Sequence, residues 1–251
     1  MLRLPFPMRL DVFLAENGFA VSRSEAKSLI QSGAVFLDGK PLTKPAFDIT
    51  GQEEKILLDR RMRKYVSRGG NKLEGALLAF KIPVRGRYAL DIGASSGGFT
   101  DCLLQNGAAR VIAADVGSGQ LVPSLRSDPR VFVMENFNAR YMSAEDLPYL
   151  PDLCVMDVSF ISATHIIPAV YRTLADRADF ICLVKPQFEV GRAGVGKGGI
   201  VRDEALRADA LRRVSAFAEQ YGFAARGSIV SPIPGGDGNI EYLVHFEKRI
   251  D

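Results

Sequence analysis

Four charged residues in this sequence, Lys72, Asp157, Lys185 and Glu241, lie where side chains from separate elements could meet. Asp157 and Lys185 each close an apolar stretch that is typical of a core strand. A single charge at a strand end is more often a solvated or capping residue, but two on neighbouring core strands fit that explanation less well. Ligands of open α/β sheets bind beyond the carboxyl ends of the strands, so these residues indicate a polar site at that edge.

Two amines and two carboxylates suit the removal of a proton from a hydroxyl group. A ribose 2′-hydroxyl is a poor nucleophile and must lose its proton as it attacks an electrophile. A lysine can take that proton when burial and nearby cations lower its pKa. The carboxylates would orient the amines and the hydroxyl, and this positioning contributes most to methyl transfer.

A glycine-rich segment, Gly93–Thr100, follows an expected strand and precedes a helix pattern. Such a turn lets the backbone approach a ligand and directs helix N–H groups toward it. Asp115 ends the next expected strand about 20 residues further on, where a carboxylate can bind ribose hydroxyls. The turn alone is shared by NAD, FAD and S-adenosylmethionine enzymes, or it holds no ligand. Its candidate cofactor contacts are Gly93, Ser95, Gly97 and Gly98.

Alternating strand and helix patterns predict a parallel α/β sheet in the larger part of the chain. The strongest helix pattern runs from Asp203 to Tyr221, and another helix, which carries Lys72, is expected to start near Asn71. The expected strands cover residues 88–92, 110–115, 130–134, 152–158, 179–185, 223–231 and 240–247.

The segment between the last two expected strands, Pro232–Asn239, leaves no room for a helix. A parallel crossover needs a dozen or more residues, so the last strand should run antiparallel. Its start then lies at the edge reached by Asp157 and Lys185, and Glu241 can join them. Seven strands with an antiparallel insertion favour an S-adenosylmethionine methyltransferase, because the dinucleotide-binding sheet has six parallel strands.

The N-terminal residues form a separate pattern of two short helices and a β-hairpin. The first helix is expected over Arg9–Asn17, and the second starts at a capping box formed by Ser22 and Glu25. A strand at 34–37 leads into an Asp-Gly turn and a second short strand. Residues 59–68 form a basic linker that is either solvated or in contact with RNA. We therefore expect domains at 1–58 and 69–251.

The segment Gly191–Gly198 resembles a P-loop but has Gly198 where that motif needs a serine or threonine for Mg²⁺. It also follows the fifth strand instead of the first. We therefore expect no nucleotide hydrolysis here; the segment either covers the substrate or is an ordinary surface loop.

Composition excludes several classes of protein. The net charge is +3, and no apolar run approaches the length of about 20 residues that spans a bilayer. The N-terminus lacks the apolar core of a signal peptide, so a cytoplasmic location is expected. The three cysteines lack the spacing of a disulfide framework or zinc site, and we expect no metal. Both His165 and His245 are expected to be structural or surface residues.

Several stretches together resemble the hemolysin A (TlyA) family of ribosomal RNA methyltransferases, and the resemblance covers essentially the whole chain. These stretches are RLDVFLAENGFAVSRSEAKSLIQSGAVFLDGK, YVSRGGNKLEGAL, LDIGASSGGFTDCLLQNGA, DVSFIS, LVKPQFEVGR and VGKGGIVRD. The resemblance implies a Rossmann-like seven-stranded S-adenosylmethionine methyltransferase sheet of the FtsJ type. It also implies a small N-terminal α+β RNA-binding domain of the ribosomal protein S-four type.

The resemblance also implies roles for individual residues. A Lys–Asp–Lys–Glu tetrad would fall on the four charged residues named first, with Lys185 as the general base. S-adenosyl-L-methionine would contact Gly97, Phe99, Asp115, Asn136 and Asp157. RNA phosphates would be bound by Arg9, Arg23, Lys27, Lys40 and Arg68.

The expected reaction is 2′-O-methylation of cytidine in large-subunit ribosomal RNA, and in some family members in small-subunit RNA too. The short chain ends match the subgroup that is limited to the large subunit. Ribosomal RNA or a ribosomal subunit is thus the expected partner.

Three other functions were weighed. A membrane-active hemolysin would need an apolar or long amphipathic segment, which the sequence does not show. A catalytically silent ribosome-binding protein is disfavoured because all four tetrad positions hold the required residue types. A small-molecule methyltransferase is disfavoured by the basic N-terminal unit.

Overall fold

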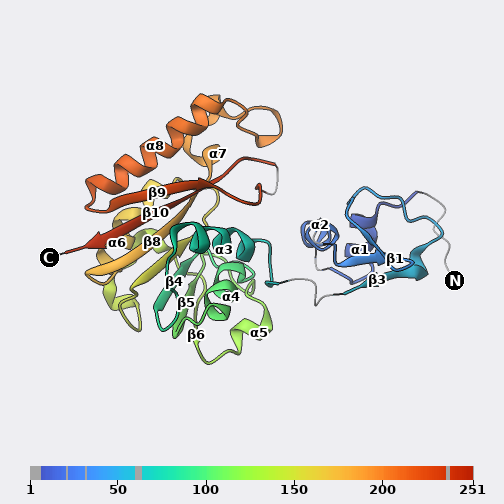
Figure 1. Cartoon of the computed structure of the whole chain (residues 1–251), viewed down its shortest axis with the longest axis horizontal. Helices are drawn as coiled ribbons and strands as arrows, with labels where there is room; N and C mark the ends of the chain where they lie inside the picture. Colours follow the sequence, from blue (N-terminus) through green and yellow to red (C-terminus); the bar gives the residue numbers. More distant parts are fainter. Residues whose placement is uncertain (1–6, 21, 32, 60–63, 236–237, 251) are drawn as a thin grey trace. The chain divides into compact units, whose positions relative to one another are not determined.

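The computed structural model describes residues 7–20, 22–31, 33–59, 64–235 and 238–250. The chain divides into two compact units, Met1–Arg68 and Gly69–Asp251 (Figure 1). Residues 59–68, which the sequence set apart as a linker, group with the first unit, and residues 60–63 of that segment lie outside the described part. Each unit has its own structure.

The first unit packs two helices on a small antiparallel sheet of order β2-β1-β3. The apolar residues Leu10 and Leu14 of the first helix and Leu29 and Ile30 of the second are fully buried. They form the core that holds the unit together. The elements are α1 (Leu10–Glu16), α2 (Arg23–Gln31), β1 (Val35–Leu37), β2 (Lys40–Leu42), η1 (Glu53–Lys55) and β3 (Ile56–Leu58).

The local signals in this unit behave as expected, with one omission. The Ser22 hydroxyl accepts a hydrogen bond from the Glu25 amide at 3.2 Å, as an N-cap should. The hairpin turn has positive φ at Asp38 and Gly39. The strand β3 was not predicted, because its three residues form no alternating pattern and depend on pairing with β1.

The second unit is a seven-stranded sheet of order β6-β5-β4-β7-β8-β10-β9. The first five strands of that order are parallel, and β10 is antiparallel to both β8 and β9. The predicted antiparallel last strand is thus confirmed. The strands are β4 (Tyr88–Ile92), β5 (Arg110–Ala114), β6 (Val131–Met134), β7 (Leu153–Met156), β8 (Arg177–Val184), β9 (Ala224–Val230) and β10 (Tyr242–Arg249).

Helices cover both faces of this sheet. Leu90 and Ile92 of β4 pack into a core cluster with residues of α6 and α8. Side chains alternate along a strand, so Asp91 faces the other side, where it contacts α4, which packs against α3. The helices are α3 (Gly69–Phe80), α4 (Gly98–Gln105), α5 (Pro123–Arg126), α6 (Ile167–Thr173), α7 (Pro186–Glu189) and α8 (Glu204–Gln220).

The element bounds correct several predictions. Asp157 and Lys185 are the residues that follow β7 and β8, not the last residues of those strands. The helix that carries Lys72 begins at Gly69, before the polar residues taken as its start. The helix predicted from Asp203 is confirmed as α8, and the Asp203 carboxylate caps it by accepting a hydrogen bond from the Ala205 amide at 2.8 Å.

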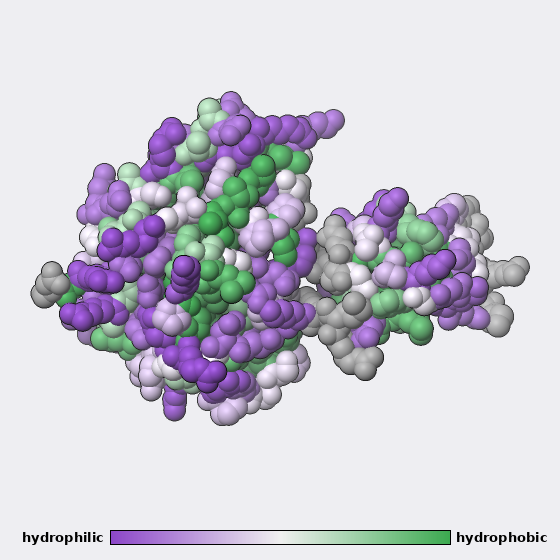
Figure 2. All heavy atoms as spheres, in the orientation of Figure 1, coloured by the Kyte–Doolittle hydropathy of each residue, from purple (hydrophilic) through white to green (hydrophobic). Residues whose placement is uncertain are grey.

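The surface in view is mostly hydrophilic, with a band of apolar residues on the larger unit (Figure 2). Among the described helices, none is long and apolar enough to cross a membrane.

Candidate active site

The four charged residues predicted to meet do meet, at the carboxyl edge of the parallel strands. Asp157 and Lys185 follow neighbouring strands, β7 and β8. Tyr242 of β10 lies opposite Val184 of β8, which brings Glu241 beside Lys185. Lys72 reaches Glu241 from α3, a helix of the opposite end of this unit's sequence.

The four residues form two ion pairs. The Lys72 Nζ lies 2.6 Å from Oε2 of Glu241, and both residues are buried, at 8% and 2% exposed. The Lys185 Nζ lies 2.5 Å from Oδ1 of Asp157, and these two side chains are more accessible. The pairs differ in what they can do: the first is sealed, whereas the second faces a pocket.

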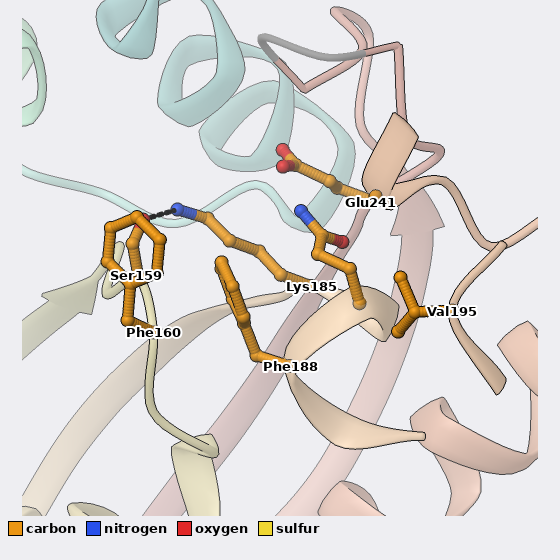
Figure 3. A pocket seen from close by; sticks show the side chains of 8 residues that line it. Ser159, Phe160, Lys185, Phe188, Val195 and Glu241 are labelled. Atoms are coloured by element: carbon orange, nitrogen blue, oxygen red, sulfur yellow. Dashed lines mark hydrogen bonds between the residues drawn. The ribbon is translucent and has the colours of Figure 1, made fainter. Parts of the chain in front are cut away.

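The pocket beside Lys185 has a volume of about 320 Å³ (Figure 3). Two phenylalanines at its mouth lie with ring centroids 5.3 Å apart, and Phe160 is 91% exposed. The segment that resembled a P-loop contributes Val195 and Gly199, so it does lie at the site. The pocket is lined by Ser159, Phe160, Lys185, Gln187, Phe188, Val195, Gly199 and Glu241.

Ser159 was not predicted as a site residue. Its hydroxyl accepts a hydrogen bond from the Lys185 Nζ at 2.8 Å. The amine of Lys185 is therefore held from two sides by residues of one loop, Asp157 and Ser159. A signal was present in the sequence, since Ser159 lies two positions after the strand-end aspartate, but a serine in a loop is too common to single out.

The glycine-rich segment forms a tight turn between β4 and α4. Gly93 has φ of +81°, and a Cβ there would lie 2.2 Å from the backbone oxygen of Asp157. Gly97 has φ of +98° and caps α4. Gly98 and Phe99 begin the helix and are buried, so the Phe99 side chain belongs to the core and offers a ligand its backbone alone.

Asp115 organises the other side of this turn. Its carboxylate accepts hydrogen bonds from the amides of Ser95 at 2.8 Å and Gly117 at 2.7 Å. The Asn136 amide donates to the carbonyl of Gly117 at 3.0 Å. The predicted cofactor residues Ser95, Asp115 and Asn136 are thus joined through one short network.

The electrostatics of this turn suit a cationic ligand. Burial, together with the nearby charges of Asp157 and Asp115, raises the pKa of Asp91 to about 7 although Thr100 donates a hydrogen bond to it at 2.7 Å. The Oδ1 of Asp91 is buried and accepts no hydrogen bond from the described residues. S-adenosylmethionine carries a sulfonium and an ammonium group, so these carboxylates and the glycine turn fit it.

The predicted RNA-binding residues all lie in the first unit. A fully buried carboxylate, Asp11, pairs with Arg9 at 2.9 Å and Arg23 at 3.2 Å, and both guanidinium groups stay about half exposed. Burial acts to raise the pKa of Asp11, but the two arginines outweigh it and lower that pKa. Lys27 and Lys40 are exposed. Asp11 was not predicted, because an aspartate in an amphipathic helix normally faces solvent.

The remaining predicted positions are less decisive. Arg68 is half-buried, and the nearby Tyr65 is buried, so the basic segment is not solvated throughout. His165 is exposed, whereas His245 is buried and bonds Asp179 at 2.8 Å. Within the described ranges, Asp179, His245 and Glu247 are close enough to hold a metal ion, but arginines already neutralise both carboxylates.

The strand order, the glycine turn after β4 and the acidic residue after β5 define a Rossmann-like methyltransferase fold. Comparisons with known proteins agree. The family model of the FtsJ-like methyltransferases matches residues 65–248, and that of the S4 domain matches residues 8–55. The predicted fold class is thereby confirmed for both units.

Individual relatives narrow the class further. The 16S/23S rRNA (cytidine-2′-O)-methyltransferase TlyA of Mycobacterium tuberculosis is 46% identical over 97% of this chain and 91% of its own length. Hemolysin A of Brachyspira hyodysenteriae is 45% identical over 95% of this chain and 99% of its own. A solved structure from Streptococcus thermophilus, described as a hemolysin, superposes with a TM-score of 0.77 at 44% identity, covering 97% of this chain and 89% of that one. The chain therefore belongs to the TlyA (hemolysin A) family of FtsJ-like methyltransferases.

Proposed function

We propose that this protein methylates the 2′-hydroxyl of a cytidine in ribosomal RNA, with S-adenosyl-L-methionine as methyl donor. The observation that carries the proposal is the pair of ion pairs at one pocket, Lys185 with Asp157 and Lys72 with Glu241. The relative from Mycobacterium tuberculosis, named as a 16S/23S rRNA (cytidine-2′-O)-methyltransferase, supports the substrate. Large-subunit RNA is the first target to test, and small-subunit RNA the second.

Lys185 is the general base in this proposal. Its amine takes the proton of the ribose hydroxyl, and the Asp157 carboxylate stabilises the positive charge that the lysine gains. Ser159 fixes the direction of the amine through its hydrogen bond. Glu241, held by Lys72 on its buried side, lines the pocket opposite and orients the hydroxyl.

The turn after β4 is the proposed cofactor site. When bound there, S-adenosyl-L-methionine supplies an electrophilic methyl group. The carboxylate of Asp115 would bind ribose hydroxyls, and Asp91 and Asp157 would compensate the positive charges. The other proposed contacts are Gly93, Ser95, Gly97, Gly98, Phe99 and Asn136.

The first unit is the proposed RNA-binding domain, at residues 1–58. Arg9 and Arg23, aligned by Asp11, together with Lys27, Lys40 and Arg68, would bind phosphates. Phosphate contacts position a protein without reading sequence, so this unit would dock on the shape of the RNA. The proposed substrate is ribosomal, and we therefore infer a cytoplasmic location.

Transfer of tritiated methyl groups to separated large and small ribosomal subunits, followed by mapping of the modified ribose, tests the proposal. We expect label on a cytidine 2′-oxygen in the large subunit. Label on a base, or none on either subunit or on free ribosomal RNA, would contradict it. A liposome-leakage assay with the same preparation tests the membrane activity suggested by the relative's name.

The base assignment makes a sharper prediction. Lys185→Ala should lower methyl transfer by at least about 10³-fold, because general acid–base catalysis contributes up to about 10⁴-fold, with cofactor affinity nearly unchanged. Single-turnover kinetics and calorimetric titration with S-adenosyl-L-methionine would measure the two effects. Exposed Lys197 offers a matched control, and Lys197→Ala should retain most of the rate. Undiminished turnover in Lys185→Ala would remove the lysine from the mechanism.

A further inference from the structure

One loop carries the residues that hold the Lys185 amine. It runs from Asp157, directly after β7, to Ala163, where the one-turn helix η5 (Ala163–His165) begins. The amide of Asp157 is anchored to the carbonyl of Ile92 at 2.9 Å, but Ser159 and the residue after it are exposed. The far end of the loop therefore needs an anchor of its own.

Glu189 supplies that anchor. Its Oε1 accepts a hydrogen bond from the Ala163 amide at 2.8 Å, and its Oε2 accepts one from the Ser162 hydroxyl at 2.6 Å. A carboxylate is well suited to this place, because the amide belongs to the first turn of η5, where backbone N–H groups have no partner within the helix.

The helix α7 joins this anchor to the lysine. Lys185 is the N-cap of α7 and Glu189 is its last residue, so one helical turn separates them. Lys185 contacts the start of the loop through Asp157 and Ser159, and Glu189 contacts its end. The guanidinium of Arg213 in α8 also donates to the carbonyl oxygen of Glu189, which ties α7 to the body of the unit.

We infer that Glu189 is a positioning residue for the reaction, and that it acts through the loop on Lys185. The inference rests on the proposed role of Lys185 as base. Without the carboxylate, the Ala163 amide and the Ser162 hydroxyl lose their acceptor at the loop's far end. The loop then gains freedom, and Ser159 no longer holds the amine in one direction.

Two substitutions of Glu189 test this inference by kinetics. Glu189→Ala removes both acceptors, and kcat for methyl transfer should fall about 10- to 100-fold, the cost of a misplacement near 1 Å. KM for RNA and Kd for S-adenosyl-L-methionine should stay within about twofold, because neither ligand touches the residue. Glu189→Gln should recover most of kcat: its amide oxygen can accept from Ala163, and its NH₂ can donate to Ser162.

Glu219→Ala is the matched control, since Glu219 is an exposed glutamate of α8. It should leave kcat unchanged. Hydrogen–deuterium exchange gives a readout that needs no activity: residues 157–164 should exchange faster in Glu189→Ala than in the parent protein, while strands β4 and β7 keep their protection. Unchanged exchange in this loop would overturn the inference.

A double-mutant cycle with Ser159→Ala separates positioning from general destabilisation. If Glu189 acts through Ser159, the losses in kcat from the two substitutions should be smaller together than their sum. Additive losses, or a loss explained by a lowered Tm, would count against the positioning role. If the parent protein methylates RNA, Lys185→Ala is inactive and Glu189→Ala is fully active, then this inference alone fails and the proposed function stands.

Discussion

At the residue scale, the site is a balance of buried charges. Lys72 and Glu241 are both buried and bonded to each other, so removing either one leaves an unpaired buried charge that costs about 3–5 kcal/mol. Lys185 and Asp157 form the more accessible pair. The sealed pair fixes Glu241 in place, and the open pair is left to exchange a proton with a substrate.

Asp91 makes the stability of the protein depend on pH. Its pKa is raised from 3.8 to about 7, first by burial, so the folded state holds a proton that the unfolded chain releases near pH 4. The stabilisation is complete below pH 4 and is lost as pH rises to about 7, by on the order of 4 kcal/mol. Asp91→Asn should remove this dependence and be more stable than the parent at pH 8.

Urea unfolding between pH 5 and 8 measures the effect, with the difference in unfolding free energy between the two proteins as the quantity of interest. Asn can keep the hydrogen bond from Thr100, so the comparison isolates the charge. A difference that stays constant across this range would show that Asp91 does not titrate there.

At the element scale, the glycine turn and the loop after β7 determine each other. The close approach of Gly93 to the Asp157 carbonyl lets β4 and β7 end side by side. The cofactor turn and the lysine-holding loop therefore share one backbone contact. A change in one element must displace the other.

Gly93→Ala should damage both elements. The new Cβ would lie 2.2 Å from a backbone oxygen, at a φ that disfavours any side chain, and backbone atoms cannot move aside cheaply. We expect a loss of about 2–4 kcal/mol in unfolding free energy and loss of cofactor binding. Calorimetry and thermal unfolding would measure these.

Gly227→Ala is the control for that substitution. Gly227 lies in β9 without a positive φ, and its nearest neighbour would be a Phe80 ring carbon at an ordinary 3.7 Å. It should change stability by less than about 1 kcal/mol. Equal behaviour of the two variants would mean that the turn after β4 tolerates a side chain.

At the scale of the whole molecule, recognition and chemistry belong to separate units. Each unit has its own core, and the four tetrad residues all lie in the second. Electrostatic binding by the first unit would raise the local concentration of RNA at the second, without taking part in the reaction.

This separation predicts that residues 59–251 alone bind S-adenosyl-L-methionine but fail to methylate ribosomal RNA. In the full chain, Lys27→Glu with Lys40→Glu should weaken RNA binding and flatten its salt dependence by about two phosphate contacts. Filter binding over a salt series and methyl-transfer assays measure this. Full RNA methylation by the truncated protein would instead favour a role for the first unit outside catalysis.

The sequence by itself determined the elements and the chemistry of the site. Apolar periodicity, turn residues and caps act between near neighbours along the chain, and they predicted the seven strands, the helix α8 and the antiparallel last strand. The short segment before β10 was enough to place Glu241 at the same edge as Asp157 and Lys185.

The tertiary structure decided which groups pair. Lys72 and Glu241 are 169 residues apart, and nothing local specifies that one neutralises the other. The roles of Ser159, Glu189 and Asp11 appear only once burial and contact are known, because a serine or a carboxylate has the same local pattern whether it faces solvent or holds a neighbour. Pairing and desolvation depend on three-dimensional proximity, which no short segment of the chain encodes.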